Sequence, residues 1–307
     1  MMSGGLDSAL AAKVLMEQGV EVVALCFSSP FFGCDDARKV SASLGIELLE
    51  IDFTERILEI LRSPKHGFGR NLNPCIDCHS AMISEALGIM EENQAGFVAT
   101  GEVLGERPMS QNRRSLDIVA AASGRPELVL RPLSARLLEP TLPELKGWVD
   151  RDKLLGIRGR SRKTQLELAE SWRLEWYKSP AGGCLLTDPG YATRLGRLMR
   201  EMPGFDREDV RLLGLGRHFW VEDCLVVIGR NRRENGELAA AALPTDILLK
   251  ERSNPGPLAL VRTRPRGSAP SSQAMEEAAK LLGRYGKEKR PLAPEELMRW
   301  DPRQGEP

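Results

Sequence analysis

The amino-acid sequence predicts an α/β protein: a parallel-sheet domain with helices on both faces, a mostly helical extension and a small C-terminal α+β domain. Three observations predict this organisation. Short apolar runs alternate with helically spaced apolar residues over residues 1–135. A turn rich in glycine and serine directly precedes an apolar helix near the N-terminus. Short strand-like runs around charged turns follow residue 206.

The first domain is expected over residues 1–135, where strands and helices alternate as they do in parallel sheets. The expected strands are residues 20–27, 46–53, 96–101 and 128–133. The expected helices are residues 8–17, 35–44, 54–61 and 80–90. Ligands of such sheets bind at the carboxyl ends of the strands, where the loops here are rich in glycine, cysteine and arginine.

The rest of the chain is expected to form an extension, a second domain and a tail. Residues 136–206 form the mostly helical extension, with helices at 148–155, 163–172 and 192–202 and a Pro-Ala-Gly-Gly-Cys turn at 180–184. Residues 207–290 form the small domain, with strands at 210–213, 219–220, 225–229 and 258–262. Residues 291–307, rich in proline, glutamate and arginine, form a loosely ordered tail.

Composition excludes several classes of protein. The 307 residues are 42% hydrophobic and 28% charged, and no apolar run approaches the roughly 20 residues of a membrane span. The opening residues do not resemble a targeting peptide, so we expect a cytoplasmic protein whose six cysteines are core, catalytic or metal-binding thiols. Residues 211–290 carry 15 basic and 9 acidic residues, which suggests either a surface for an anionic partner or merely a solvated face.

Residues 3–8, Ser-Gly-Gly-Leu-Asp-Ser, predict an anion-binding turn. Two glycines allow the backbone to turn tightly and point its N–H groups at one spot, and the serine hydroxyls and the helix N-terminus add further donors. No Gly-Lys-Ser/Thr follows, which excludes the common nucleotide-triphosphatase loop. A glycine turn with an Asp or Ser helix cap is the alternative interpretation.

Three cysteines predict a second chemical centre. Cys75 and Cys78 have Cys-x-x-Cys spacing just before an expected helix, whose N-terminus together with Arg70 would lower a thiol pKa. Cys184 follows two glycines far along the chain and offers a third sulfur. The residues alone leave three interpretations open: three ligands of a [4Fe–4S] cluster with one open iron, a zinc site with His79 as the fourth ligand, or a redox-active cysteine pair.

The motifs resemble those of a known superfamily. Residues 3–8 are similar to the signature of the PP-loop ATP pyrophosphatases, whose fold is of the adenine nucleotide α hydrolase type. Together with Asn-Pro-Cys-Ile-Asp-Cys-His at 73–79, Ala-Thr-Gly-Glu at 99–102 and the segment 179–192, they resemble the tRNA thiolation branch, close to tRNA 2-thiouridylases and 4-thiouridine synthetases. The resemblance spans residues 3–202.

This resemblance implies cofactors and site residues. It implies ATP with Mg²⁺, and a [4Fe–4S] cluster held by Cys75, Cys78 and Cys184, with zinc as the alternative metal. The same cysteines and Asp7 are the implied catalytic residues. The implied nucleotide-binding residues are Ser3, Gly4, Gly5, Asp7, Ser8, Phe27 and Gly101.

The family pattern also raises an expectation about the N-terminus. Members usually carry a full apolar strand before the serine, whereas only Met1 and Met2 precede it here. We expect either that upstream residues are missing because the start is misassigned, which we favour, or that a truncated strand leaves a central position of the sheet vacant.

The C-terminal part carries a second resemblance. Residues 215–219 and 228–231 are similar to a small RNA-binding domain of the NFACT-R type, in agreement with the local excess of positive charge. His218 beside Phe219 and Trp220 could stack on an RNA base, although core packing is the expected role of the two aromatic residues.

Other polar residues are candidates for the same site. Four follow the expected strand that ends at Gly101: Glu102, Arg107, Ser110 and Gln111. A basic cluster, which is either a phosphate or RNA contact or a solvated helix start, contains Arg158, Arg160, Arg162 and Lys163. His66 and His79 could donate to a substrate or to the cluster, although solvated side chains are the expectation. Three cysteines are expected to serve packing: Cys26, Cys34 and Cys224.

The resemblances imply an ATP-dependent sulfurtransferase that adenylates a uridine carbonyl in tRNA, replaces its oxygen by sulfur, and releases AMP and pyrophosphate. Its implied partners are tRNA and a sulfur donor, either sulfide or a persulfide carrier. The alternatives are a PP-loop ligase or thiolase acting on a non-RNA substrate, a thiolase that relays a persulfide without a cluster, and a noncatalytic RNA-binding protein with structural zinc.

Overall fold

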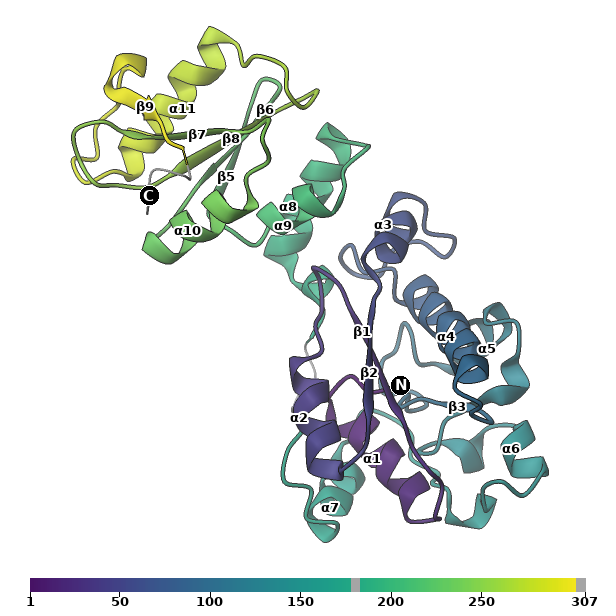
Figure 1. The fold of residues 1–307 in the computed structure, drawn as a ribbon. Coiled ribbons are helices and arrows are strands. Elements are labelled where there is room, and N and C mark those ends of the chain that lie inside the picture. Colours follow the sequence, from purple (N-terminus) through teal and green to yellow (C-terminus); the bar gives the residue numbers. More distant parts are fainter. Residues whose placement is uncertain (178–182, 302–307) are drawn as a thin grey trace. The chain divides into compact units, whose positions relative to one another are not determined.

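The computed structural model describes residues 1–177 and 183–301, and the chain divides into two compact units, Met1–Pro189 and Gly190–Pro307 (Figure 1). The division falls earlier than the expected boundary near residue 206. The reason is that helix α8 (Pro189–Glu201) bonds to the following helix and its end: Tyr191 donates to the Val210 carbonyl at 3.5 Å and Arg194 to the Leu213 carbonyl at 2.9 Å. No helix within the described residues is long and apolar enough to cross a membrane.

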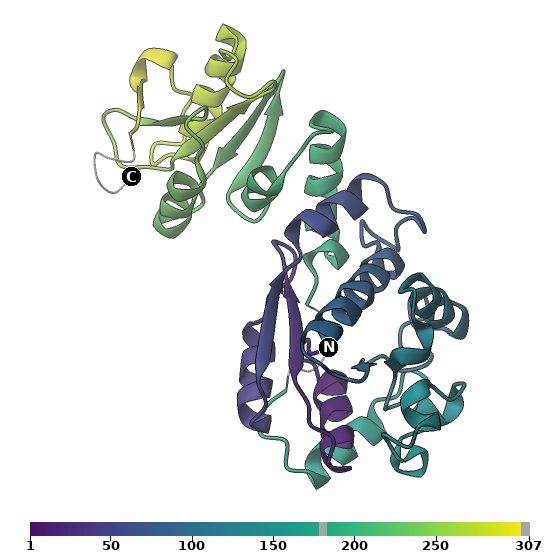
Figure 2. The ribbon, with the colours of Figure 1, turned by 45° about the vertical axis from the view of Figure 1, so that its right-hand side comes forward.

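The first unit contains two pairs of parallel strands (Figure 2). Strand β1 (Ala24–Ser28) pairs with β2 (Leu48–Asp52), with Ala24 opposite Leu48. Strand β3 (Val98–Ala99) pairs with β4 (Val129–Leu130). The parallel arrangement is as predicted, but β3 and β4 are much shorter than the runs at 96–101 and 128–133.

The first two residues lie between these two pairs of strands. The amino group of Met1 donates to the carbonyl of Ala99, beside β3, at 2.6 Å, and the N–H of Met2 donates to the carbonyl of Leu25 in β1 at 2.7 Å. The central position that we expected to be vacant in a truncated sheet is therefore occupied at one end by Met1 and Met2. The Ser3–Ser8 turn begins directly beyond that end.

Helices surround the strands of the first unit. They are α1 (Leu6–Met16), α2 (Asp35–Leu44), α3 (Thr54–Arg62), α4 (Cys75–Glu92), α5 (Arg113–Ala122), α6 (Leu142–Leu145) and α7 (Lys163–Ser171). The prediction of a helix at 148–155 was wrong, because this segment contains only a short 3₁₀ turn, Arg151–Lys153. The carboxylate of Asp150 accepts from the N–H of Asp152 at 3.0 Å, which satisfies the backbone locally and favours a turn.

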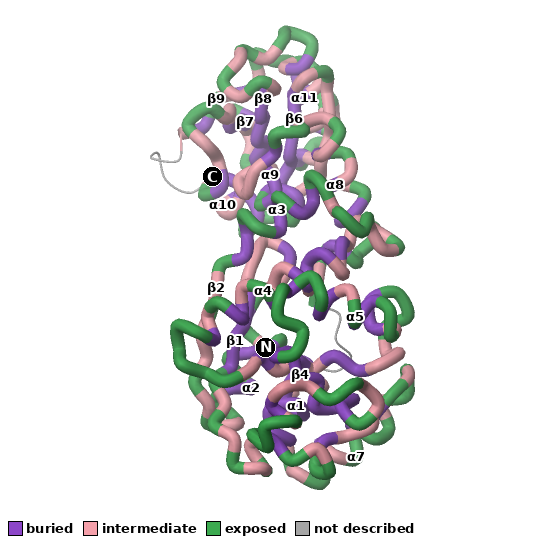
Figure 3. The backbone as a smooth tube through the Cα atoms, turned by 90° about the vertical axis from the view of Figure 1, so that its right-hand side faces the viewer, coloured by how far each residue is buried: buried purple, intermediate pink, exposed green. Residues whose placement is uncertain are grey.

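Helix α1 is the centre of the hydrophobic core of this unit, and Figure 3 shows it as buried. One side of the helix, including Leu10 and Val14, packs with Leu130. The other side, including Ala9 and Ala12, packs with the apolar residues around β1 and α2. Because α1 is apolar on both sides, its N-terminus is held rigidly beside the ends of the strands.

The second unit is an antiparallel sheet with the strand order β5-β6-β8-β7-β9. The strands are β5 (Arg217–Val221), β6 (Cys224–Ile228), β7 (Ile247–Glu251), β8 (Ala259–Thr263) and β9 (Leu297–Arg299). Helix α11 (Ser272–Tyr285) packs on one face of the sheet and α10 (Arg232–Ala241) on the other, so β6 and β8 are buried from both sides (Figure 1, Figure 3).

Two predictions for this unit were wrong. Residues 210–213 are not a strand, because Val210 lies in helix α9 (Arg207–Leu212), which Asp206 caps by accepting from the N–H groups of Glu208 and Asp209. The expected tail is not loosely ordered throughout, because residues 297–299 form β9, which pairs with β7. The end of that tail, residues 302–307, lies outside the described residues.

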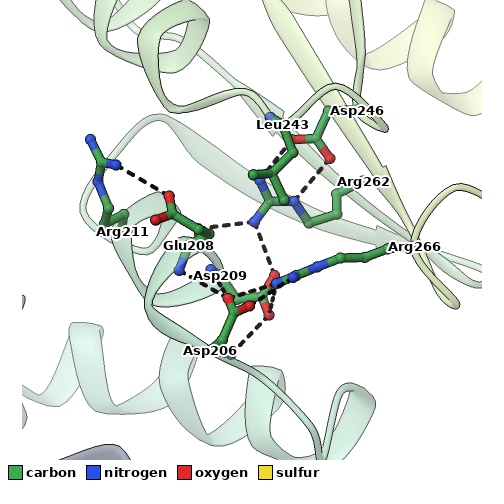
Figure 4. A network of polar contacts seen from close by, with 8 residues as sticks. All are labelled: Asp206, Glu208, Asp209, Arg211, Leu243, Asp246, Arg262 and Arg266. Carbon is green, nitrogen blue, oxygen red and sulfur yellow. Dashed lines mark hydrogen bonds and ion pairs between the residues drawn. The ribbon is translucent and has the colours of Figure 1, made fainter. Parts of the chain in front are cut away.

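A buried ionic network joins α9 to the sheet (Figure 4). Arg262 of β8 has a fully buried side chain and contacts Asp209 at 2.9 Å and Asp246 at 2.6 Å. Arg266 contacts Asp209 at 2.5 Å and Asp206 at 2.7 Å. Because both Asp209 and Asp246 are as buried as Arg262, their charges depend on these guanidinium partners.

Replacing Arg262 by alanine is expected to destabilise the second unit by about 3–5 kcal/mol, since it leaves the buried carboxylate of Asp246 without a counter-charge and removes one guanidinium partner of Asp209. Arg233→Ala is the control, because this exposed arginine pairs with Glu237 on the surface of α10, and its replacement should cost at most about 0.5 kcal/mol. Urea unfolding of the full chain measures both. Equal losses in the two variants would show that the buried network contributes no more than a surface pair.

Candidate functional site

A cavity of about 550 Å³ opens in the first unit at the carboxyl ends of the strands. The start of α1, the start of α4, the segment after β3 and the loop carrying Cys184 all contribute to its walls. The predicted residues that line it are Ser3, Gly5, Asp7, Ser8, Phe27, Cys75, Cys78, Gly101 and Cys184. The fold therefore brings the predicted anion-binding turn and the three predicted cysteines to one cavity.

The anion-binding turn is built by its own hydroxyls. The hydroxyl of Ser8 donates to the carbonyl of Gly5 at 2.8 Å, and the hydroxyls of Ser3 and Ser8 lie 3.3 Å apart. The helix begins at Leu6, and its first N–H groups have no partner within the helix, as in every α-helix. Hydroxyls and free N–H groups at a helix N-terminus form an arrangement that binds phosphate.

Two glycines allow this turn to pack closely. Gly4 has a φ of +78°, and a Cβ at this position would lie 2.3 Å from the backbone of Asp36. A Cβ on Gly101 would lie 2.6 Å from the backbone nitrogen of Ser8. Gly101 thus lets the segment after β3 touch the start of α1, whereas Gly4 packs against α2 and is not among the residues that line the cavity.

Two carboxylates and two arginines lie beside the turn. Burial raises the pKa of Asp7, against the effect of Arg162, whose guanidinium lies 3.9 Å from the Asp7 carboxylate. Burial and the Asp7 charge raise the pKa of Glu106, which lies 3.8 Å from Arg162. The charge of Arg107 acts on both carboxyls and also on Cys184. Asp7 and Glu106 supply oxygen ligands of the kind that Mg²⁺ prefers.

The first two cysteines lie in a helix rather than before it. Helix α4 begins at Cys75, five residues earlier than predicted, so Cys75 and Cys78 are on the same side of its first turn. Cys184 comes from the 3₁₀ turn Leu185–Thr187, which is fixed by a hydrogen bond from the Leu185 N–H to the Phe31 carbonyl at 2.9 Å. A side-chain N–H of Asn73 donates to the sulfur of Cys75 at 3.2 Å.

The environment of the thiols differs from the expectation that the helix N-terminus and Arg70 would lower a thiol pKa. Burial, followed by the nearby Cys184 and Cys75, raises the pKa of Cys78 well above its usual value, and burial raises the pKa of Cys184 to about 11. Desolvation therefore outweighs the helix N-terminus. Over residues 1–177 and 183–301, no three His, Cys, Asp or Glu side chains are arranged to hold a metal ion as they stand.

Two histidines, expected to be solvated, instead pair with buried carboxylates. Nδ1 of His66 lies 2.6 Å from a carboxylate oxygen of Asp77, and Nδ1 of His79 lies 3.0 Å from Glu102. Arg131 donates to the other oxygen of Glu102 at 2.9 Å. Although burial alone would raise the pKa of Glu102, Arg131 and His79 lower it to about 2. These pairs fix the orientation of the helix turn that carries the cysteines.

Sequence reasoning did not identify some of the polar residues that lie in or beside the cavity. Glu106 carries no motif signal, and Asp77 lies within the motif at 73–79 but was given no role, because each acts through a neighbour that the fold supplies: Arg162 comes from the start of α7 and His66 from the loop before α4. Of the candidates left open, Glu102, Arg107 and Gln111 line the cavity. Arg162 contacts the site through Asp7. Cys26 also lines the cavity, although it is 3% exposed and packs in the core.

In this chain an anion-binding turn at the ends of parallel strands, an arrangement like that of PP-loop domains, is followed by a separate small antiparallel domain. Residues 1–136 match the family model of the thiamine biosynthesis protein (ThiI), and residues 216–294 match that of the NFACT protein RNA binding domain. The chain thus carries a ThiI-type PP-loop domain and an NFACT-type domain, and both resemblances seen in the sequence are confirmed.

Curated relatives match part of the first unit. The tRNA-specific 2-thiouridylase of Desulforamulus reducens is 33% identical over 122 residues, covering 33% of this chain and 33% of the relative. That of Dehalococcoides mccartyi is 33% identical over 116 residues, covering 33% and 32%. This chain therefore spans about a third of the length of these relatives.

Solved structures also match, at low similarity. The U34-tRNA thiolase NcsA from Methanococcus maripaludis with its [4Fe-4S] cluster has a TM-score of 0.33 and 19% identity, with 72% of each chain covered. The C-terminal part of the fibronectin/fibrinogen-binding protein from Streptococcus suis has a TM-score of 0.22 and 13% identity, with 70% of this chain and 80% of that chain covered.

Proposed function

We propose that this protein is an ATP-dependent tRNA sulfurtransferase, which activates a uridine carbonyl as an adenylate and replaces its oxygen by sulfur. The main support for the proposal is that the anion-binding turn and three cysteines line the same cavity. The volume of this cavity, about 550 Å³, is in the range of nucleotide-sized ligand sites. The match to tRNA-specific 2-thiouridylases over part of the first unit supports the reaction class.

The turn and its neighbours perform the activation. The hydroxyls of Ser3 and Ser8 and the free N–H groups at the start of α1 bind the phosphates, and Asp7 and Glu106 would hold Mg²⁺, which would supply positive charge for them. The uridine carbonyl oxygen attacks the α-phosphorus, and pyrophosphate leaves with the electron pair of the broken P–O bond. The positive charge of Arg107 and the N–H groups stabilise the leaving group, so catalysis is mainly positioning and charge stabilisation.

Substitution follows at the same carbon. A sulfur nucleophile adds to the activated carbon, and AMP leaves with the original uridine oxygen, so a C–S bond replaces the C–O bond. Cys75, Cys78 and Cys184 would hold a [4Fe–4S] cluster, whose chemistry would be to bind the sulfur for the transfer. The three thiols line one cavity and Asn73 donates to the sulfur of Cys75, so the donors are of the kind that such a cluster uses, although over residues 1–177 and 183–301 they are not arranged to hold a metal ion as they stand.

The burial of the thiols favours ligation over the redox-pair alternative. A thiol whose pKa is raised, as that of Cys78 is, remains protonated at neutral pH and is a poor nucleophile or redox partner by itself. A bound metal ion deprotonates such a thiol and compensates the cost of burying the charge. Zinc on the same cysteines is the alternative occupant. The sulfur donor is sulfide or a persulfide carrier, and a tRNA substrate supports a cytoplasmic location of the reaction.

The nucleotide product tests the proposal. Full-length protein is loaded anaerobically with iron and sulfide and incubated with ATP, sulfide and unmodified tRNA, and the nucleotides and the digested tRNA are analysed by mass spectrometry. We expect AMP and pyrophosphate in equal amounts, formed only with tRNA present, and one thiolated uridine per AMP. Asp7→Asn, which removes the charge beside the turn, should abolish AMP formation.

Three outcomes would contradict the proposal in different ways. ADP as the product would exclude adenylation. AMP formation that does not depend on tRNA would favour the ligase or thiolase acting on a non-RNA substrate. Absence of any ATP turnover, together with one tightly bound zinc, would favour the noncatalytic RNA-binding protein.

A further inference from the structure

Strand β5 forms one edge of the antiparallel sheet in the second unit and pairs only with β6 among the described strands. Its side chains alternate between the two faces of the sheet. Phe219 and Val221 belong to the cluster that packs beneath α11, whereas Trp220 belongs to the cluster on the other face. All five residues of β5 remain partly exposed. The edge therefore presents aromatic side chains on both of its faces.

On the α11 face, arginines flank an aromatic ring. The guanidinium carbon of Arg217 lies 4.5 Å from the ring centroid of Tyr285, and that of Arg284 lies 5.8 Å from it. The ring of Phe219 lies 5.9 Å from that of Tyr285. Tyr285 is the last residue of α11 and is only partly buried, so the stacked ring and guanidinium group stand at the rim of the sheet.

The other face of β5 repeats this pattern with α8. The guanidinium carbon of Arg197 lies 6.0 Å from the ring centroid of Trp220, and Arg197 itself is exposed. Arg200, one turn further along α8, is exposed as well. The two faces of a single edge strand thus carry one aromatic–arginine pair each.

Among the described residues, the arginines beside the aromatic rings lack the carboxylate partners that other arginines of the same unit have. Arg233, Arg264 and Arg290 each pair with a glutamate. In the part of the chain that the structure describes, Arg197, Arg217 and Arg284 contact aromatic rings and have no carboxylate within 4.0 Å. Their charges are therefore available to an anionic partner, and Arg217 and Arg284 belong to the segment 211–290, which carries 15 basic and 9 acidic residues.

We propose that the β5 edge binds unpaired RNA nucleotides. Bases stack on the Tyr285–Arg217 and Trp220–Arg197 pairs, and the backbone phosphates contact Arg284 and Arg200. Aromatic rings and guanidinium planes are the surfaces on which proteins stack single-stranded bases, and a rigid duplex would not expose its bases to them. This proposal rests on the proposed function only because it takes RNA as the bound polymer. It goes further by naming the surface that binds the RNA and by specifying that the bound nucleotides are unpaired.

Fluorescence anisotropy with the full chain, in the absence of ATP, tests this surface. The probes are a fluorescein-labelled 15-nucleotide oligouridylate and a 15-base-pair RNA duplex. We expect tighter binding of the oligouridylate, about tenfold weaker binding by Tyr285→Leu, and binding within about twofold of wild type by Tyr285→Phe, which keeps the ring. Arg217→Gln should weaken binding about fivefold and reduce the slope of log affinity against log salt by about 0.7.

Arg233→Gln is the matched control, because it removes one positive charge from α10 of the same unit, where the arginine is paired with Glu237. It should bind within about twofold of wild type. Equal losses for Arg233→Gln and Arg217→Gln, unchanged binding by Tyr285→Leu, or preference for the duplex would each overturn the proposal. Because no ATP is present, the result is independent of the AMP test: the binding surface can fail while thiolation stands, and the reverse.

Discussion

Replacing Cys78 by alanine is expected to reduce the iron and acid-labile sulfide of anaerobically reconstituted protein from about four each per chain to nearly zero. Cys78 is the most buried of the three cysteines predicted to hold the cluster, and both Cys75 and Cys184 act on its pKa, so it lies close to both other donors. Two remaining thiols cannot hold a cubane cluster stably. Iron and sulfide assays and the visible absorption spectrum measure the loss without any reference to activity.

Cys224→Ala is the matched control for the same experiment. It removes a thiol that is likewise buried, but from β6 in the second unit, and Cys224 is not among the residues that line the cavity. Its iron content should equal that of wild type even if it unfolds at a somewhat lower temperature. Stoichiometric zinc with no iron in wild type would contradict the cluster and favour the zinc alternative, and unchanged iron in Cys78→Ala would exclude Cys78 as a ligand.

Those parts of the site that depend on contiguous residues were predictable from the sequence. The Ser3–Ser8 turn combines glycine, hydroxyl and helix-start signals within six residues, and its geometry follows from them. The cysteines were recognisable by residue type and spacing. The direction of their pKa shift was not, because desolvation depends on the packing of α4 and on the loop of Cys184, which is more than 100 residues away in the chain.

The errors in the fold have a common physical origin. The run Val210–Leu213 has strand-like composition, but Asp206 caps a helix through it, and four residues are too few for apolar spacing to distinguish the two. Strand β9 lies in a segment rich in proline and charge and forms only because β7 offers it an edge to pair with. Tertiary partners decide such short elements, and the sequence does not reveal those partners.

Gly101→Ala is expected to lower the rate of AMP formation about 100-fold. The added Cβ would lie 2.6 Å from the backbone nitrogen of Ser8, and neither backbone can yield as a flexible side chain would. The segment after β3 and the start of α1 must therefore move apart, which shifts the phosphate-binding N–H groups from their positions. A displacement of about 1 Å in such a site costs about two orders of magnitude in rate, and the crowding costs about 1–3 kcal/mol of stability.

Gly88→Ala makes the same chemical change where the structure leaves room for it. Gly88 is an exposed residue within α4, and no atom lies within 4 Å of an added Cβ. This variant should keep the wild-type rate and gain up to about 1 kcal/mol of stability, because alanine favours the helix. AMP release and thermal unfolding of both variants, measured side by side, separate the two effects. A wild-type rate in Gly101→Ala would mean that the close approach of β3 and α1 is not needed for adenylation, and that the anion-binding turn acts in some other step.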